Sequence, residues 1–123
     1  MEKVIINDHI RGEPLAEENI DDVLDLVNKI RLSRPQKSIG LYTGYIWKEI
    51  IGAKHENQFE NLGNGYGKLT KRAEIIMNCN ILVDGRYVDS ERDITLPYRG
   101  SKNQRLIDVQ QSLQKGKIVL WQT

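Results

Sequence analysis

Short β-branched runs alternate with helical patterns in the first half of this chain, and that alternation is the strongest constraint on its fold. Residues 4–6 and 38–42 are apolar runs of strand length, while residues 19–32 and 44–51 carry apolar side chains at helical spacing. A strand–helix–strand–helix order is typical of parallel strands joined by helical crossovers. The sequence therefore predicts an α/β fold with a mainly parallel sheet.

The clearest helical pattern covers residues 19–32. Asn19 is the predicted N-cap, and Asp22 follows it at the spacing of a capping box. Pro35 marks the end of the helix. Apolar residues recur at helical spacing and share one face: Ile20, Val23, Leu24, Val27 and Ile30.

A shorter helix is predicted for residues 44–51. Thr43 is its predicted N-cap and Gly52 its C-terminal stop. We expect Tyr45, Trp47 and Ile51 to pack in the core, because aromatic and aliphatic side chains at such spacing usually do so.

Residues 53–68 are polar and rich in glycine. A phosphate-binding loop is excluded, because Leu69 follows Lys68 where the Walker A pattern requires Ser or Thr. We expect a mobile surface loop within a single domain that covers residues 1–123.

The second half of the chain continues the pattern. Residues 70–78 predict a helix, and residues 81–83 predict a buried strand that a turn at Asp84 and Gly85 ends. Cys79 lies between them and is predicted to be a small core residue, since no basic neighbour could activate its thiol. Residues 105–109 and 117–121 predict strands that pair as an antiparallel hairpin at the sheet edge, with a turn or short helix at 110–116.

Composition narrows the class of protein. The net charge of +1 gives no electrostatic case for nucleic acid or an acidic membrane. No apolar run approaches the roughly 18 residues of a membrane span, and no signal peptide begins the sequence. A single cysteine suggests a reducing compartment, so a cytoplasmic protein is expected. His9 is predicted to be a surface residue, because it has no second ligand at metal spacing.

A dense polar cluster leads into the fourth predicted strand, at residues 105–109. We expect its side chains to lie outside the core, either as a solvated loop or as a site that holds a charged, planar group. The cluster consists of Arg99, Gly100, Ser101, Lys102, Asn103, Gln104 and Arg105.

The order of residues in this region resembles a known family. Residues 82–87 and 93–109 closely resemble the C-terminal segment of the anaerobic ribonucleoside-triphosphate reductase-activating proteins, which are radical S-adenosylmethionine (SAM) enzymes that install a glycyl radical on their reductase. Gly12, Glu13 and Pro14 resemble the Gly-Gly-Glu-Pro word of the same enzymes, and residues 35–45 resemble the strand that follows it. The similarity extends over residues 11–121.

The resemblance implies a fold and a set of site residues. The fold would be part of an open β/α barrel, and the backbone at Gly12, Glu13 and Pro14 would hold the amino group of SAM. Arg11 replaces the first glycine of the word. Thr43 and Asp84 would face the same cofactor from the ends of later strands.

The polar cluster would lie near the open end of that barrel. We expect it to contact the large subunit of the reductase. The residues expected to bind this partner are Arg99, Gly100, Asn103, Gln104 and Arg105.

One feature of the family is missing from this sequence. Its members carry three cysteines whose thiolates hold a [4Fe–4S] cluster, and SAM binds the fourth iron. Cys79 is the only cysteine here. We therefore expect no cluster, no metal and no catalytic residue in this chain alone, which would be a truncated or inactive form of the activase.

Two further expectations follow. A barrel without its leading strand and helix would expose a sheet edge, so we expect self-association or binding of a complementary N-terminal fragment. Two alternative functions remain: a non-catalytic module that docks on the reductase, and an interaction protein that reuses the scaffold for another partner.

Overall fold

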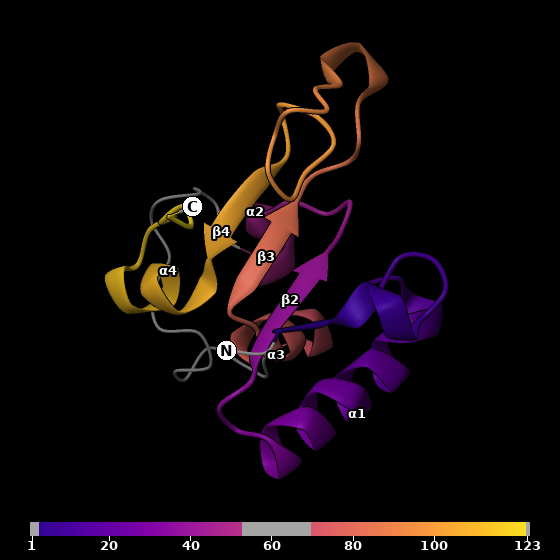
Figure 1. Cartoon of the computed structure of the whole chain (residues 1–123). Helices are drawn as coiled ribbons and strands as arrows, with labels where there is room; N and C mark the ends of the chain where they lie inside the picture. The colour runs from indigo at the N-terminus through magenta and orange to yellow at the C-terminus, as the bar shows by residue number, and fades with distance from the viewer. Residues whose placement is uncertain (1–2, 53–69, 123) are drawn as a thin grey trace.

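The computed structural model describes residues 3–52 and 70–122, which form a mixed α/β fold around an open sheet. The sheet has four strands in the order β1-β2-β3-β4 (Figure 1). β2 is parallel to both β1 and β3, whereas β4 is antiparallel to β3. The predicted α/β class and mainly parallel sheet are confirmed. The strands are β1 (Lys3–Ile5), β2 (Ser38–Tyr42), β3 (Ile81–Asp84) and β4 (Arg105–Asp108).

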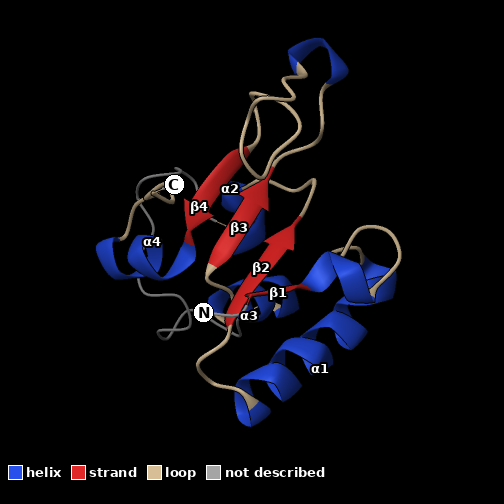
Figure 2. Ribbon diagram, viewed as in Figure 1, coloured by secondary structure: helices blue, strands red, loops and turns tan. Residues whose placement is uncertain are grey.

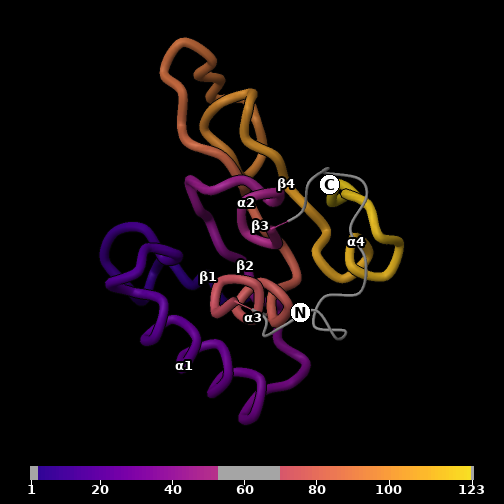
Figure 3. The backbone as a smooth tube through the Cα atoms, turned by 180° about the vertical axis from the view of Figure 1, so that it is seen from behind, coloured from indigo at the N-terminus to yellow at the C-terminus, as the bar shows by residue number. Residues whose placement is uncertain are grey.

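All the α-helices of the described residues bury side chains against the same face of this sheet. Seen from behind, α2 and α3 lie in front of the strands, and α1 runs along the β1 side (Figure 3). The helices are α1 (Glu17–Ser33), α2 (Trp47–Ile51), α3 (Lys71–Met77) and α4 (Val109–Lys115), and two 3-10 turns, η1 (Ile6–His9) and η2 (Asp89–Glu91), complete the elements (Figure 2).

Alternation along the strands sorts side chains between two hydrophobic clusters. Leu41, Leu82 and Ile107 point to the helical layer, where Val23, Val27, Trp47 and Ile76 meet them. Their neighbours Ile81, Val83 and Leu106 form a smaller cluster on the opposite face, with Tyr42 and Trp121 at its margin. The face that carries no helix is therefore apolar as well.

Helix α1 begins earlier than predicted. Its N-cap is Ala16, so the prediction of Asn19 as the cap is wrong. The Asn19 amide instead donates to the carbonyl oxygens of Arg11 (3.1 Å) and Glu13 (2.9 Å) from within the first turn. The Asn19 side chain, which the local sequence assigned to a cap, is thus hydrogen-bonded to the loop that precedes the helix.

Helix α2 is shorter than predicted, and Thr43 does not cap it. Its N-cap is Ile46, whose backbone N–H donates to the Glu49 carboxylate at 3.1 Å. The predicted stop is confirmed, because Gly52 adopts a left-handed conformation with φ of 70°. Trp47 is fully buried, as predicted for a core residue.

The C-terminal hairpin is replaced by a strand–helix–bridge arrangement. β4 forms as predicted, but α4 follows it directly and residues 117–121 are not a strand. Two backbone bonds still join the returning chain to β4, from Asp108 N to Val119 O (2.8 Å) and from Trp121 N to Leu106 O (2.9 Å). The predicted antiparallel contact is present only as an isolated bridge between Ile107 and Leu120.

The predicted glycine-rich loop at 53–68 lies outside the described residues. Within the part of the chain that is described, no helix has the length and apolar content needed to cross a bilayer.

Arg31 joins the ends of two helices near the start of β2. Its guanidinium donates to the carbonyl oxygens of Asn78 (2.7 Å) and Lys37 (2.6 Å), to that of Pro35 (3.2 Å), and to the side chain of Asn80 (2.7 Å). Carbonyls at helix ends lack intrahelical donors, and a guanidinium offers several N–H groups in one plane. Arg31 therefore fixes α1, α3 and the entry to β2 together.

We predict that Arg31→Leu lowers the free energy of unfolding by about 3 kcal/mol, because several acceptors lose their donor at once. Urea denaturation of the purified chain measures this loss. Arg34→Leu is the matched control, since Arg34 is an exposed arginine one turn away, and it should change stability by no more than about 0.5 kcal/mol. Equal losses in the two variants would contradict the prediction.

Candidate functional site

The carboxylate of Glu13 joins two loops at the carboxyl ends of β1 and β2. One oxygen, Oε2, accepts from the backbone N–H of Leu15 (2.7 Å) and from the hydroxyl of Thr43 (2.9 Å). The other, Oε1, accepts from the backbone N–H of Gly44 (2.6 Å). The structure thus brings together two predicted site residues, Glu13 and Thr43. Their side-chain oxygens are hydrogen-bonded to each other and to backbone N–H groups.

The loop that carries Glu13 is held from both sides. Gly12 adopts φ of 79°, a conformation that favours glycine, and Pro14 is buried. From α3, Arg72 donates to the carbonyl oxygen of Leu15 at 2.6 Å, and its guanidinium lies 4.6 Å from the centre of the Tyr45 ring. Sequence analysis missed Arg72, because only the tertiary fold brings α3 under this loop.

Asp84 is the second carboxylate at this edge, and it is 1% exposed. Its Oδ2 accepts from the backbone N–H of Trp47 (2.9 Å) and from Arg105 Nη2 (2.6 Å), and its Oδ1 accepts from Arg105 Nε (3.0 Å). Asp84 therefore joins the end of β3 to the start of α2 and to β4. Two predicted residues, one from the cofactor set and one from the partner set, form this ion pair.

Arg86 lies at the same edge and was not identified from the sequence. A Cβ on Gly44 would stand 3.2 Å from Arg86 Cγ and 3.4 Å from Glu13 Oε1, so the Arg86 side chain packs against the loop after β2. Arg86 is exposed. The glycine at position 44 allows this close approach, which leaves a cation beside the Glu13 loop.

Most of the polar cluster is bonded internally. Gln104 accepts from the backbone N–H groups of Gly100 (2.9 Å) and Ser101 (3.1 Å), and it donates to the carbonyl of Gly85 (3.1 Å). Asn103 donates to the carbonyl of Arg86 at 2.7 Å. These residues therefore shape the connection between β3 and β4. The sequence had suggested only a solvated loop or a site for a charged, planar group.

Ser101 contradicts the expectation that the whole cluster lies outside the core, because it is fully buried. Its hydroxyl accepts from the backbone N–H of Val88 (3.2 Å) and donates to Asn103 Oδ1 (2.6 Å). A small hydroxyl group that meets both a donor and an acceptor can leave water at little cost.

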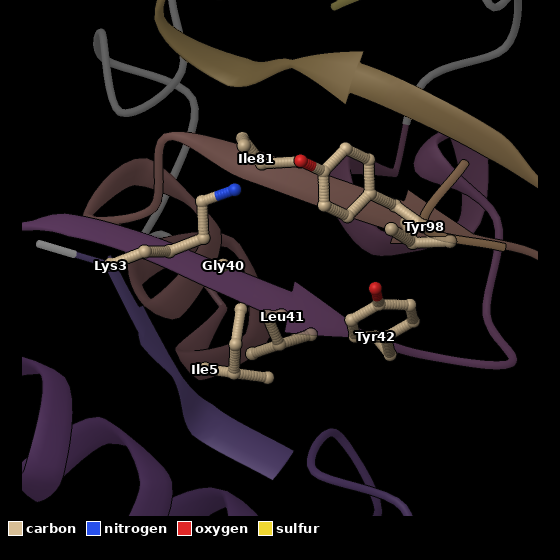
Figure 4. A pocket seen from close by; sticks show the side chains of 8 residues that line it. Lys3, Ile5, Gly40, Leu41, Tyr42, Ile81 and Tyr98 are labelled. Atoms are coloured by element: carbon tan, nitrogen blue, oxygen red, sulfur yellow. The ribbon is translucent and has the colours of Figure 1, made fainter. Parts of the chain in front are cut away.

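The helix-free face of the sheet holds a small cavity beneath Tyr98 (Figure 4). The Tyr98 ring lies across the face, with Lys3 Nζ 4.7 Å from its centre, and Gly40 and Tyr42 form part of the floor. The cavity has a volume of about 20 Å³, which is room for a single water molecule. Burial, followed by the nearby Tyr98 and Asp8, raises the pKa of Tyr42. No cofactor of the size of SAM fits this cavity.

The residues present do not fit an iron–sulfur cluster. Cys79 is the chain's one cysteine, and it is fully buried behind β3. Burial raises the pKa of its thiol to about 12, and the thiol faces the carbonyl of Ile75 at 3.4 Å. A [4Fe–4S] cluster needs several thiolates. Among the described residues, no three of the His, Cys, Asp and Glu side chains gather as metal ligands.

Comparison with known proteins gives one family model and a consistent set of relatives. The model described as the 4Fe-4S single cluster domain matches residues 9–107. No solved structure matches the chain significantly.

The curated relatives bear a single name, anaerobic ribonucleoside-triphosphate reductase-activating protein. That of Escherichia coli K12 is 33% identical over 93 residues, which is 76% of this chain and 49% of the relative. That of Salmonella typhi is 32% identical over the same shares, and that of the bacteriophage T4 is 28% identical over 77% of this chain and 47% of its own length. The chain spans about half the length of these relatives. The resemblance predicted from the sequence is confirmed.

We predict that Glu13→Gln lowers the free energy of unfolding by about 1–3 kcal/mol, because an amide cannot accept bonds at both of its ends and one backbone N–H is left unpaired. Chemical denaturation measures the loss, and hydrogen exchange should show faster exchange at the Gly44 or Leu15 amide. Glu91→Gln, at an exposed glutamate, is the control and should leave both quantities unchanged. A stable variant with unchanged exchange would contradict the role assigned to Glu13.

Proposed function

This chain belongs to the family of the 4Fe-4S single cluster domain, and we propose that it serves the activation of anaerobic ribonucleotide reductase as a member without a cluster of its own. In this proposal the reductase is the partner, because the similar proteins are named as its activating proteins. The open sheet, with its helices on one face, would be an arc of a β/α barrel.

The state of Cys79 is the observation that carries the proposal. One buried thiol with a pKa near 12 cannot supply the set of exposed thiolates that a [4Fe–4S] cluster requires. Without a cluster the chain has no source of the electron that cleaves SAM. It would therefore be inactive as an activase by itself.

A role in holding SAM remains part of the proposal, limited by the geometry of the site. Thr43 and Asp84 have their side-chain oxygens bonded to protein groups, so we assign them to positioning the loops. The exposed backbone at Gly12, beside Glu13 and Pro14, is what could meet the amino group of a ligand.

The edge strand β1 supports contact with a further polypeptide segment. β1 pairs with β2 on one side, and a groove of about 360 Å³ lies between β1 and α1. Val4, Leu26 and Ile30 contribute apolar lining, Arg34 and Lys37 add positive charge, and Asp8 adds a carboxylate. We favour a complementary segment over self-association as the occupant of this edge.

Contact with the reductase is proposed to involve the predicted partner residues in two ways. Arg99 would touch the partner directly. Gly100, Asn103, Gln104 and Arg105 would act through the shape of the connection that they hold, since their polar groups are bonded within it.

We predict that anaerobic reconstitution with iron and sulfide yields far less than one cluster per chain and no [4Fe–4S] EPR signal after reduction. Iron analysis of the desalted protein gives the first quantity. Cys79→Ala is the control and should retain the same iron content as the wild type, because Cys79 is not a ligand. Near-stoichiometric iron with a cluster signal in the wild type would overturn the proposal.

We predict that a separately produced cysteine-bearing segment of a curated relative forms a one-to-one complex with this chain, whereas the chain alone remains a monomer. Light scattering measures both masses. The same segment with its cysteines changed to serine should still bind but support no reductive SAM cleavage. Stable dimers of the chain alone, or no complex with either segment, would contradict the proposed use of the β1 edge.

A further inference from the structure

The connection between β3 and β4 is an ordered arm, here defined as residues 85–104. It projects beyond the carboxyl end of β3, roughly along the direction of the strands (Figures 1 and 2). Gly85 begins it with φ of 97°, a turn that favours glycine. The Asp84–Arg105 ion pair closes its base, where the two limbs return to neighbouring strands.

Hydrogen bonds between its limbs keep the arm in one shape. Lys102 N donates to Glu91 O (3.0 Å), and Asp93 N donates to Gly100 O (3.1 Å). Nearer the base, Gln104 bonds both to the returning limb and to Gly85. The arm therefore does not depend on a hydrophobic core of its own for order.

Three large apolar side chains of the arm are exposed, although the Tyr98 ring also lies over the helix-free face of the sheet. Ile94 is 84% exposed, Tyr98 56% and Tyr87 50%, and these are three of the five large hydrophobic residues that are exposed in the described part of the chain. A projection that is fixed by polar bonds yet displays an isoleucine is typical of a surface that another protein covers.

The acidic and basic side chains of the arm differ in the hydrogen bonds that they form. Two of its three acidic groups have partners within the arm, since Asp89 accepts from the Tyr87 hydroxyl (3.0 Å) and Asp93 accepts from the backbone N–H of Thr95 (3.0 Å), while Glu91 is exposed. Arg92, Arg99 and Lys102 form no side-chain hydrogen bond or ion pair with any described residue, and Arg99 Nε is buried without an acceptor. The arm thus presents exposed cations, at Arg92 and Lys102, on the same projection as Ile94, while two of its three carboxylates are hydrogen-bonded within it.

We infer that the arm is the docking element for the protein partner and fits a recess with apolar walls and carboxylates at its rim. Ile94 enters the recess, and Arg92, Arg99 and Lys102 pair with the rim. The inference rests on the proposed function, because the partner is the reductase proposed above. In this inference the exposed side chains of the arm contact the partner directly. The internally bonded residues of the polar cluster hold the arm in shape.

The test is the affinity of the full chain for purified anaerobic ribonucleotide reductase, measured by biolayer interferometry. Ile94→Asp should weaken binding at least tenfold, because it places a charge in the apolar recess. Leu32→Asp is the matched control, since Leu32 is 87% exposed but lies at the end of α1, and it should bind as the wild type does. Denaturation of both variants should show unchanged stability.

A second pair of variants tests the charges. Lys102→Glu should weaken binding, and added salt should weaken wild-type binding through screening. Lys115→Glu, on α4, should have no effect. If the wild type binds and Ile94→Asp and Lys102→Glu bind equally well, the inference is overturned while the proposed partner stands. If the wild type does not bind the reductase, the proposed partner is overturned and the inference falls with it.

Discussion

A carboxylate that leaves water has to be surrounded by hydrogen-bond donors, and this requirement organises the functional edge of the sheet. Glu13 and Asp84 each take three donated bonds, and most of the donors come from segments remote in sequence. Glu13 ties the loop before α1 to the loop after β2, and Asp84 ties β3 to α2 and β4. The loops at the strand ends depend on these two groups for their positions.

The same bonds limit the chemistry available at this edge. A carboxylate whose oxygens already accept from backbone and guanidinium groups has little capacity left to bind a ligand or to take up a proton in a reaction. What the edge still offers is the backbone near Gly12 and the exposed guanidinium of Arg86. Most of the carboxylate oxygens at this edge are hydrogen-bonded within the fold, so few of them remain for a ligand.

The sequence predicted elements where local and tertiary preferences agree. The strand at Ser38–Tyr42 has the predicted bounds, and Cys79 is the predicted small core residue. Asn19 and Thr43 were assigned to caps by the same reasoning that is sound for Thr70, whose hydroxyl accepts from Ala73 N. In both failures the side chain meets the Glu13 loop instead. Nothing within a few residues of Asn19 or Thr43 encodes that meeting, because the loop reaches them only after the fold forms.

The polar cluster shows a second limit of sequence reasoning. Residue type alone does not distinguish a side chain that meets water from one that meets backbone groups of its own connection. Ser101 and Gln104 are bonded inward, while Arg99 and Lys102, their neighbours in sequence, carry no such bonds to described residues. The distinction depends on how the two limbs of the arm face each other. That geometry is fixed by the pairing of β3 with β4 and by the turn at Gly85.

The match to the family extends over most of a chain that has a single cysteine. The match to the family covers the strands, the helices and the loops between them, and these are held by apolar packing, Arg31 and two carboxylates. These interactions are made by the chain's own side chains and backbone. The scaffold also presents surfaces to solvent. In the described residues those surfaces are the open edge of β1 and the ordered arm with Ile94 in solvent, and each is an arrangement that folding alone does not explain.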